Sequence, residues 1–497
     1  MTEPVIIVGA GIAGLWAALN LSPRPVILLT GAPLGTGAAT GWAQGGIAVP
    51  DGPGDSVEAH IDDTILAGTG LCDPNVARLL SEGIASEIDA LRSLGVRFEC
   101  GPEGRLSLGL EAAHTHPRIA HVRGDQAGVE ILSVLVKAAR QSEHIDIREG
   151  WRALSLLPAI DGSCAGVLAG DGRGNIHPIA SAHTLLATGG YGGLYAHTTS
   201  PPSATGSAIA MAHRLGADIA NPEFVQFHPT AIRTGEDPLP LATEALRGRG
   251  ARLIDAAGNS ITNGQDLASR DVVARAVYRA GNDGRGAYLD CRDVVGHGFA
   301  DTFPAVFAAC MRAGIDPRQT PIPVVPAAHY TMGGIATDCD GHSSIPGLWA
   351  VGECACNGLH GANRLASNSL AEGLVFARRA AEAIAVSSAR PKAHRPVAAP
   401  PVMPTIALHG LRLAMSQLAG VEKDECGLRD LQTRIKRLAA RFGGTNQIVA
   451  ARLVAEAALE RQESRGAHYR LDFQQPLPHA ENTLIAGSVQ SELVAAE

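Results

Sequence analysis

The stretch "VIIVGAGIAGLWAALNL" (Val5–Leu21) decides the fold of this 497-residue chain. Val5–Val8 read as a buried strand, and Leu15–Leu21 continue as a helix. The GxGxxG turn between them consists of Gly9, Ala10, Gly11, Ile12, Ala13 and Gly14. Strand, turn and helix in this order point a helix N-terminus at a pyrophosphate. A tight β–α turn without a ligand is the alternative, and it is disfavoured because the strand and the helix of the fingerprint are both present.

The composition is typical of a globular protein that acts on small molecules. The chain is 45% hydrophobic and 18% charged, its formal net charge is −8, and it lacks a polybasic block, so we expect no nucleic-acid partner. Its length allows about two to four domains. Without a signal-peptide pattern or an apolar run of ~20 residues, we expect a cytoplasmic protein with no membrane partner. Nine scattered cysteines indicate reduced thiols, and Cys354 and Cys356 lack a second ligand pair, so no metal is expected.

Three further segments bear on the identity of the nucleotide. The second strand, Pro25–Thr30, ends in Thr30, where a dinucleotide-binding domain usually has an Asp or Glu for the ribose, and this departure weakens the case for NAD. Two distant strands, within "AHTLLATGG" (Ala182–Gly190) and "IPGLWAVGE" (Ile345–Glu353), also end in loops, and a capped helix begins near Ser367. Nucleotide-facing ends so far apart predict an extended cofactor held by one discontinuous domain.

Motifs along almost the whole chain carry a resemblance to a known family. They are "GAGIAG", "GWAQGGIAV", "ATGG", "QFHPT", "TEALRGRGARL", "SRDVVARA", "HYTMGGI", "VGE", "NRLASNSLAEGL" and "ESRGAHYRLDF", in this order from Gly9 to Phe473. In them the chain resembles the flavoproteins of the fumarate reductase, succinate dehydrogenase and L-aspartate oxidase group. The resemblance implies an α/β fold, with a Rossmann-like FAD-binding domain, an inserted α+β capping domain and a C-terminal helical bundle.

The expected domains follow from this resemblance and from the composition. The FAD-binding domain comprises residues 1–222 and 336–388, and the capping or substrate domain comprises residues 223–335. Residues 389–404, "ARPKAHRPVAAPPVMP", form a Pro-rich linker that cannot continue a helix. Residues 405–497, including 446–466 and the remaining segment, read as amphipathic helices of a small bundle. The short tail after "AHYRLDF" favours a free-standing enzyme without an iron–sulfur subunit.

The resemblance implies that FAD is bound noncovalently. Succinate dehydrogenases carry a flavin-linking His five residues before the Gln of "AQGG", and that position here is Ala39. The helix start at Ser367–Leu370 would direct backbone N–H groups at the flavin. Ser207 replaces the carboxylate of a family "TGDG" motif. Besides the GxGxxG turn, the implied FAD contacts are Ala39, Thr40, Ala43, Gln44, Gly45, Gly46, Ser207, Glu353, Ser369 and Leu370.

Polar motifs of the capping segment indicate a pocket for a dicarboxylate. "VQFHPT" places Gln226 and His228 on one face of an extended stretch that Pro229 ends. Arg270 follows the expected cap Ser269 in the first turn of a helix, where its charge opposes the helix dipole. Taken singly, such residues are typical of structural histidines and surface arginines. The resemblance implies catalytic roles for Arg270, His228 and His329, and substrate binding by Gln226, Thr243, Glu244, Arg364 and Ser367.

The stretch "LGLEAAHTHPRIAHVRGDQAG" (Leu108–Gly128) combines one carboxylate, Glu111, with several basic residues. His114 and His116 lack the spacing and the second cluster of a metal site, and a solvated loop is the plainer alternative. By the resemblance, L-aspartate oxidases carry Glu at this position, whereas fumarate reductases and succinate dehydrogenases tend to carry Gln. A desolvated substrate ammonium needs a nearby anion, so we interpret Glu111 as its partner and as a catalytic residue.

The resemblance and Glu111 together predict a reaction. L-Aspartate would lose its Cα hydrogen as a hydride to FAD and become iminosuccinate, with reduction of O₂ to H₂O₂ or of fumarate to succinate. Iminosuccinate would feed quinolinate and NAD synthesis, with a hand-off to quinolinate synthase. The alternative is a soluble fumarate reductase or succinate dehydrogenase flavoprotein subunit. The ammonium proton would pass to Arg270 or, through a water, to Glu111.

Overall fold

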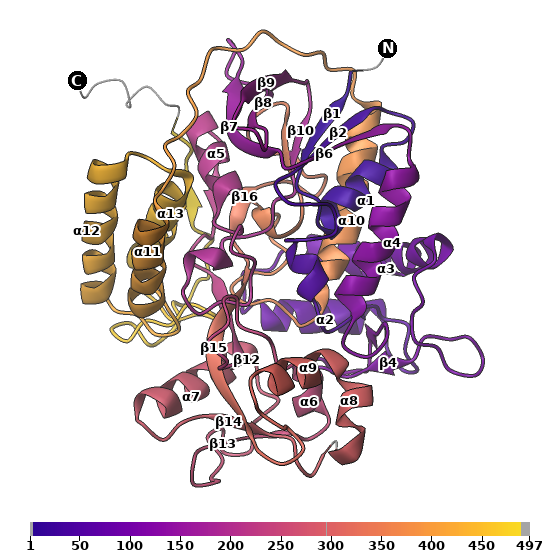
Figure 1. Ribbon diagram of the computed structural model, residues 1–497, viewed down its shortest axis with the longest axis vertical. Helices are drawn as coiled ribbons and strands as arrows, with labels where there is room; N and C mark the ends of the chain where they lie inside the picture. The colour runs from indigo at the N-terminus through magenta and orange to yellow at the C-terminus, as the bar shows by residue number, and fades with distance from the viewer. Residues whose placement is uncertain (1–2, 295, 489–497) are drawn as a thin grey trace.

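A five-stranded parallel sheet lies in the upper part of Figure 1, in a computed structural model that describes residues 3–294 and 296–488. Its strand order is β17-β10-β1-β2-β6. The strands are β1 (Val5–Val8), β2 (Val26–Thr30), β6 (Ile145–Glu149), β10 (Thr184–Leu186) and β17 (Leu348–Ala350). Ile6 pairs with Ile27 on one side and with Thr184 on the other, so β1 is central. The β17 strand therefore joins a sheet whose first strand is at the other end of the chain, as the sequence predicts.

Helices cover this sheet and bury its apolar strands. They are α1 (Ile12–Asn20), α3 (Pro74–Leu94), α4 (Ala127–Gln141) and α10 (Asn368–Val386). Gly373 of α10 lies so close to α1 that an added Cβ would be 2.9 Å from Cγ2 of Ile12. Close packing of the first and the last helix of this layer makes the FAD-binding fold discontinuous. The predicted α/β Rossmann-like fold is confirmed.

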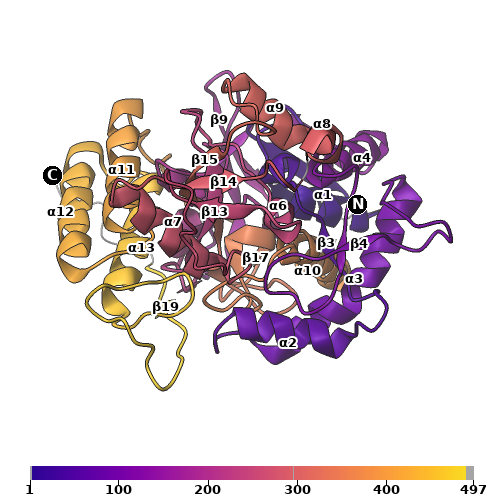
Figure 2. The ribbon, with the colours of Figure 1, turned by 90° about the horizontal axis from the view of Figure 1, so that it is seen from below.

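A second unit lies below the parallel sheet in Figure 1 and has its own apolar core. Its antiparallel sheet β12-β15-β14-β13 consists of β12 (Val225–Ile232), β13 (Arg252–Ile254), β14 (Tyr288–Asp290) and β15 (Ile322–Thr331). Its helices are α6 (Glu244–Gly248), α7 (Arg270–Asn282), α8 (Phe299–Thr302) and α9 (Pro304–Arg312). All lie within the segment 223–335, and Figure 2 shows α8 and α9 turned toward α4.

The expectation that Pro229 ends its strand is wrong. The strand β12 continues to Ile232, with a register shift against β15 between His228 and Ala231. Proline has no backbone N–H, and an irregularity in the ladder accommodates it without ending the strand. The bulge leaves His228 within a buried strand, next to the cavity described below.

Three helices form the C-terminal part at one side of Figure 1. They are α11 (Thr405–Leu418), α12 (Glu425–Phe442) and α13 (Asn446–Glu460). The expected helix over 446–466 ends early, and the remainder up to residue 488 contains the short strand β19 (Leu484–Ile485) in place of the expected helix. Buried ion pairs of Arg461 with Glu223 and Glu463 hold this irregular segment, so it needs no helical ladder. Residues 489–497 lie outside the described residues.

The remaining elements form smaller sheets and connections. The sheet β18-β16-β11-β19 contains β11 (Ile219–Ala220), β16 (Gly334–Ala336) and β18 (Ala355–Cys356). The sheets β3-β5-β4 and β7-β8-β9 contain β3 (Ile47–Ala48), β4 (Leu108–Gly109), β5 (Ile119–Ala120), β7 (Arg152–Pro158), β8 (Cys164–Gly170) and β9 (Ile176–Ala180). The other helices are η1 (Ala39–Trp42), α2 (Val57–Ala67), η2 (Gly192–Leu194), α5 (Ser207–Leu215), η3 (Gly296–Gly298) and η4 (Gly352–Cys354).

The last two observations concern the segment before the C-terminal helices and the apolar composition of the helices. Residues 387–404 contain no helix, and they make one isolated bridge, from His394 to Ala159. Within 3–294 and 296–488, no helix has the length and apolar composition that crossing a membrane requires.

Candidate active site

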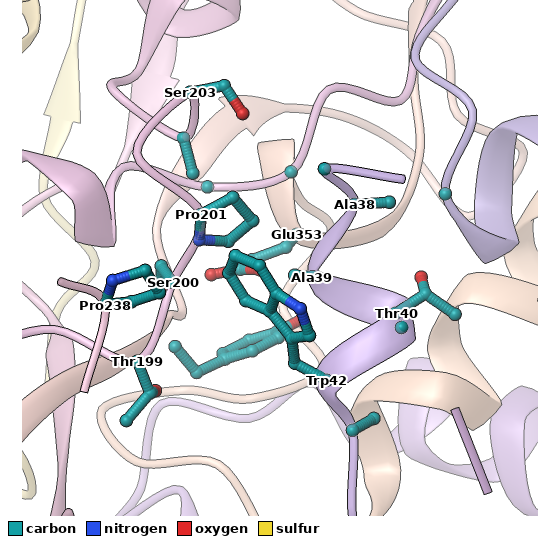
Figure 3. A pocket seen from close by; sticks show the side chains of 18 of the residues that line it. Ala38, Ala39, Thr40, Trp42, Thr199, Ser200, Pro201, Ser203, Pro238 and Glu353 are labelled. Atoms are coloured by element: carbon teal, nitrogen blue, oxygen red, sulfur yellow. The ribbon is translucent and has the colours of Figure 1, made fainter. Parts of the chain in front are cut away.

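A cavity of about 1160 Å³ lies at the carboxyl ends of the parallel strands and extends to the capping segment. Its walls include the ends of β1 and β2, the turn after β10, the loop after β17 and the beginning of α10. In doubly wound sheets this edge is where ligands bind. Figure 3 shows the Trp42 indole reaching across the cavity toward Pro201 and Pro238, with Glu353 behind it.

The first turn forms a cradle in which side chains have no room. Gly9 has φ +111°, and an added Cβ would lie 2.2 Å from the carbonyl oxygen of Ala187. A Cβ on Gly14 would lie 1.9 Å from the carbonyl oxygen of Gly9, so Gly14 permits strand–helix packing and does not itself line the cavity. The Ile12 N–H donates to the Thr40 hydroxyl at 3.0 Å, which ties η1 to the N-terminus of α1. This backbone surface suits a pyrophosphate.

The other predicted FAD contacts gather around the same cavity. Apart from Gly14, every one of them lines it, from Ala39 in η1 to Leu370 in α10. The Gln44 Oε1 atom is buried and has no hydrogen-bond partner within the described residues. Burial raises the pKa of Glu353 to about 7, although its carboxylate accepts a hydrogen bond from the Thr331 N–H at 3.0 Å. An orphaned amide oxygen and a glycine-lined cradle fit an elongated polar cofactor such as FAD.

Two histidines face one another in the part of the cavity next to the cap. The rings of His228, on β12, and His329, on β15, have centroids 5.1 Å apart. Burial, followed by the positive charge of Arg270, lowers the pKa of each well below its usual 6.5, so both rings are neutral near pH 7. Nδ1 of His228 accepts the Thr230 N–H at 3.3 Å, which leaves the ring proton on Nε2. His329 Nδ1 lies 2.8 Å from the Thr199 hydroxyl.

Two buried arginines share one amide. Oε1 of Gln226 accepts hydrogen bonds from Arg270 at 2.9 Å and from Arg364 at 3.1 Å. Its Nε2 donates to the Asn363 side chain and to the Arg364 carbonyl, both at 2.8 Å. Gln226 is therefore saturated and fully buried, and it is not among the residues that line the cavity. We assign it the positioning of the two guanidinium groups.

The two arginines that share Gln226 differ in whether an acid compensates their charge. Oε2 of Glu244 accepts two hydrogen bonds from Arg270, and Oε1 accepts one from Arg247 at 2.8 Å. Arg364 instead lies 4.5 Å from the ring centroid of Tyr330, and its Nε has no hydrogen-bond partner within 3–294 and 296–488. Burial and the charge of Arg270 lower the pKa of Arg364 to about 10, so it stays cationic at neutral pH. Of the two arginines that share Gln226, Arg364 is thus the one with unused capacity for an anionic ligand.

Glu111 brings a carboxylate to the same cavity. It lies in the loop between β4 and β5, is buried, and accepts a hydrogen bond of 2.7 Å from the Ser367 hydroxyl at the start of α10. A Cβ on Gly45 would lie 2.9 Å from Oε1 of Glu111. The carboxylate therefore stands between the predicted flavin segment and the start of α10.

The basic residues that follow Glu111 have structural partners. Arg118 is fully buried and pairs with Asp55 and Asp63, each at 2.7 Å. His114 Nε2 donates to the Ala366 carbonyl at 3.0 Å, which links the loop to the start of α10. Across the part of the chain that the structure describes, no three His, Cys, Asp or Glu side chains are arranged to hold a metal ion. The basic run therefore holds the loop of Glu111 in place.

The structure thus brings together residues from six separate elements. The predicted catalytic and substrate-binding residues that line the cavity are Glu111, His228, Thr243, Glu244, Arg270, His329, Arg364 and Ser367. Thr243 is the N-cap of α6, and its hydroxyl accepts the Ala245 N–H at 3.4 Å. Ser269 is at the N-cap of α7 as expected, but its hydroxyl donates to Asp271 and does not cap the helix backbone.

Sequence analysis missed three residues that shape the site. Tyr330 supports Arg364, Thr199 binds His329, and Asp125 accepts the backbone N–H groups of Ala305 and Val306 at the start of α9. Tyr330 could have been found from the sequence, because it follows His329 within the quoted "HYTMGGI" motif. Thr199 and Asp125 carry no local pattern, because their partners are distant in sequence.

A Rossmann-type cradle that opens into a cavity with paired histidines and arginines defines the class of FAD-dependent oxidoreductases. Two families match the chain, an FAD binding domain over residues 4–370 and the fumarate reductase flavoprotein C-terminal region over residues 444–489. The chain belongs to the L-aspartate oxidase family of these flavoproteins. The expected family, its cofactor FAD and its oxidoreductase class are confirmed.

Relatives and solved structures agree with this assignment. The chain is 49% identical to the L-aspartate oxidase of Caulobacter vibrioides, over 95% of this chain and 93% of the relative. It is 46% identical to that of Mesorhizobium japonicum, over 94% and 91%. Among solved structures, quinol fumarate reductase of E. coli superposes with a TM-score of 0.88 at 27% identity, over 98% of this chain and 97% of the other.

Proposed function

We propose that this protein catalyses the FAD-dependent oxidation of L-aspartate to iminosuccinate, with O₂ reduced to H₂O₂ or fumarate reduced to succinate. The observation that carries the proposal is the buried carboxylate of Glu111, which lines the cavity together with Arg270, Arg364 and two histidines. Glu244 lines the same cavity, but its carboxylate is already paired with Arg247 and Arg270. Succinate and fumarate offer two carboxylates and no cation. Aspartate adds an ammonium group, and a desolvated ammonium requires an anion close by.

The cations and neutral donors bind the two substrate carboxylates. The Nε of Arg364 has no hydrogen-bond partner in the described residues, and a planar guanidinium can offer two N–H groups to one carboxylate. His228, with its proton on Nε2, donates without adding charge, and His329 and the Thr243 hydroxyl face the same space. Gln226 holds the guanidinium groups of Arg270 and Arg364 at a fixed separation. A prepared set of donors orients the substrate and reduces the entropy cost of reaction.

FAD, when bound, supplies the acceptor of the hydride that leaves the substrate Cα. The ammonium must lose a proton before or as this bond breaks. Arg270 already donates two hydrogen bonds to Glu244, and a guanidinium has no free lone pair for a proton, so Arg270 is poorly suited to act as the base. We assign the proton to Glu111, directly or through a water, and electrostatic stabilisation to Arg270. The Ser367 hydroxyl orients the carboxylate of Glu111.

The product suggests a metabolic role. Iminosuccinate is an unstable imine, which fits a hand-off to quinolinate synthase and the first step of NAD synthesis. The cytoplasmic location stays a prediction. A soluble fumarate reductase or succinate dehydrogenase subunit is the second candidate, favoured by the 0.88 TM-score to quinol fumarate reductase.

Anaerobic bleaching of the flavin absorbance tests both candidates. The protein is mixed with L-aspartate or with succinate, alongside the Glu111→Gln variant and the matched control Glu103→Gln, whose side chain is exposed and does not line the cavity. We expect bleaching by aspartate, a loss of about a hundredfold or more in its rate in Glu111→Gln, and no change in the control. Bleaching by succinate alone, or an unaffected Glu111→Gln variant, would reject the proposal.

A further inference from the structure

The adenosine end of the cavity lacks the acid that a dinucleotide-binding sheet usually provides. The strand β2 ends in Thr30, whose buried hydroxyl donates to the Ala32 carbonyl at 3.0 Å and is therefore occupied. The cavity nevertheless continues past this point and is lined by Thr30, Gly31, Trp151 and Arg152. In this fold the end of the second strand faces the ribose of the adenosine. Another side chain must supply the polar contact there.

Arg152 fills the space beside that strand end. It is the first residue of β7, and its side chain crosses Gly31 so closely that an added Cβ on Gly31 would lie 3.0 Å from Cγ and 3.2 Å from Nε of Arg152. The glycine thus leaves room for the arginine at the position that follows Thr30. The path of the side chain is set by this contact and by the cavity wall.

The side chain of Arg152 differs from those of two nearby arginines, Arg140 and Arg148, because it has no hydrogen-bond or ion-pair partner among the described residues. Arg148 pairs with Asp146 at 2.9 Å, and Arg140 pairs with Glu149 at 2.7 Å. The backbone of Arg152 pairs with Gly170 in the sheet, but its side chain forms no hydrogen bond or ion pair with the residues 3–294 and 296–488. A guanidinium offers five N–H donors in a planar fork, all of which remain available here.

We propose that Arg152 binds the ribose of the FAD adenosine, donating hydrogen bonds to its hydroxyl oxygens in place of the missing carboxylate. An acidic side chain would accept from these hydroxyls, whereas the guanidinium donates to their lone pairs. The contact is separate from the substrate chemistry, so it holds or fails independently of the proposed aspartate oxidation. Arg152 is solvent-exposed in part, which limits the expected effect on affinity to about tenfold.

Cofactor binding to the apoprotein tests the assignment without any turnover. Calorimetric titrations with FAD and with FMN, which lacks the adenosine, are compared for the wild type, Arg152→Ala and Arg152→Lys. Arg173→Ala serves as the matched control, because Arg173 is an exposed arginine in the turn before β9 and does not line the cavity. We expect the Kd for FAD to rise about tenfold in Arg152→Ala and less in Arg152→Lys, and the Kd for FMN to stay within about twofold.

A titration with FAD made from 2′,3′-dideoxyadenosine separates ribose binding from adenine stacking. The wild type should bind this analogue about as weakly as Arg152→Ala binds FAD, and Arg152→Ala should bind both equally. Three results would overturn the proposal. The first is an unchanged Kd for FAD in Arg152→Ala, and the second is a rise in Kd in this variant that is equal for FAD and FMN. The third is a rise in Kd from wild type to Arg152→Ala that is as large for the dideoxy analogue as for FAD. Thermal unfolding of each apoprotein identifies a variant that fails to fold, and Arg152→Lys then decides.

Discussion

Oε2 of Glu244 accepts two hydrogen bonds from the guanidinium of Arg270, at 2.8 Å from Nε and at 2.6 Å from Nη2. Both side chains are almost wholly buried. The pair explains why an arginine occupies the first turn of α7 against the helix dipole. Arg247 binds the other oxygen of the same carboxylate. One acid thus compensates two cations beneath the cavity.

Replacing this acid by its amide should affect both folding and turnover. Burial alone would raise the pKa of Glu244, but the charges of Arg270 and Arg247 lower it, so the carboxylate is ionised in the folded protein. In Glu244→Gln two buried cations lose their counter-charge, and we expect a loss of about 3–5 kcal/mol in the free energy of unfolding. We also expect kcat to fall about a hundredfold as Arg270 shifts. Urea unfolding and steady-state kinetics measure the two effects.

The control for this variant is Glu236→Gln, at another acid that lines the cavity. Glu236 is exposed, and its carboxylate lies 3.6 Å from the guanidinium of Arg312. We therefore expect the free energy of unfolding to change by less than about 1 kcal/mol. Equal effects in the two variants would contradict the role given to Glu244.

Gly45 determines where the Glu111 carboxylate lies. A Cβ in Gly45→Ala would lie 2.9 Å from Oε1 of Glu111 and 3.2 Å from the Ser367 hydroxyl, so the carboxylate must move. We expect the KM for aspartate to rise about tenfold or more, with a smaller effect on bleaching by succinate. Gly41→Ala is the matched control, because its Cβ would touch only Cδ2 of Leu132, at 3.4 Å. A parallel loss for aspartate and succinate would show damage to the flavin site.

The histidine pair should make the protein sensitive to acid. Burial and nearby Arg270 hold the pKa of His228 and of His329 well below 6.5 in the folded state, whereas both approach 6.5 when the chain unfolds. Below about pH 6.5 the unfolded chain therefore binds more protons, and stability that is present above this pH is lost as the pH falls, by up to about 1.4 kcal/mol per pH unit for each histidine. Denaturant unfolding between pH 7 and 5 measures the slope.

Removing one histidine should reduce that slope. His329→Asn keeps a polar side chain beside Thr199 and eliminates one titrating group. We expect a shallower pH dependence than in the wild type, whereas His479→Asn, at an exposed site, should leave the slope unchanged. An identical slope in His329→Asn and the wild type would refute the prediction.

Asp125 connects the FAD-binding part to the cap. Its carboxylate accepts the N–H groups of Ala305 and Val306, at 3.2 and 3.1 Å, in the first turn of α9. Asp125→Ala removes these two hydrogen bonds from the N-terminus of α9. We expect the free energy of unfolding to fall by about 1–2 kcal/mol and the capping segment to open locally more often. Amide hydrogen exchange over residues 299–312 measures the opening. Asp301→Ala, at an exposed position in α8, is the control, and equal exchange in both variants would argue against Asp125 as the link.

Local patterns in the sequence were sufficient for several features. The GxGxxG turn and the starts of α7 after Ser269 and of α10 after Ser367 follow from neighbouring residues in the chain. The expected side-chain caps are not formed, because the Ser269 hydroxyl donates to Asp271 and the Ser367 hydroxyl donates to Glu111. Predictions failed where local and tertiary forces compete. Pro229 sits inside a strand because β15 pairs on both sides of it, and the residues after Glu460 stay irregular because distant acids bind their arginines.

By itself the sequence determined the family and the dinucleotide-binding class, and the site residues that it predicts line the cavity except for Gly14 and Gln226. Only the tertiary structure decided what each polar group does. It placed Gln226 between two arginines, Glu244 beneath them and Arg152 across Gly31. The physical reason is that hydrogen bonds and charge pairing act over a few ångströms in space, between residues that the chain separates widely.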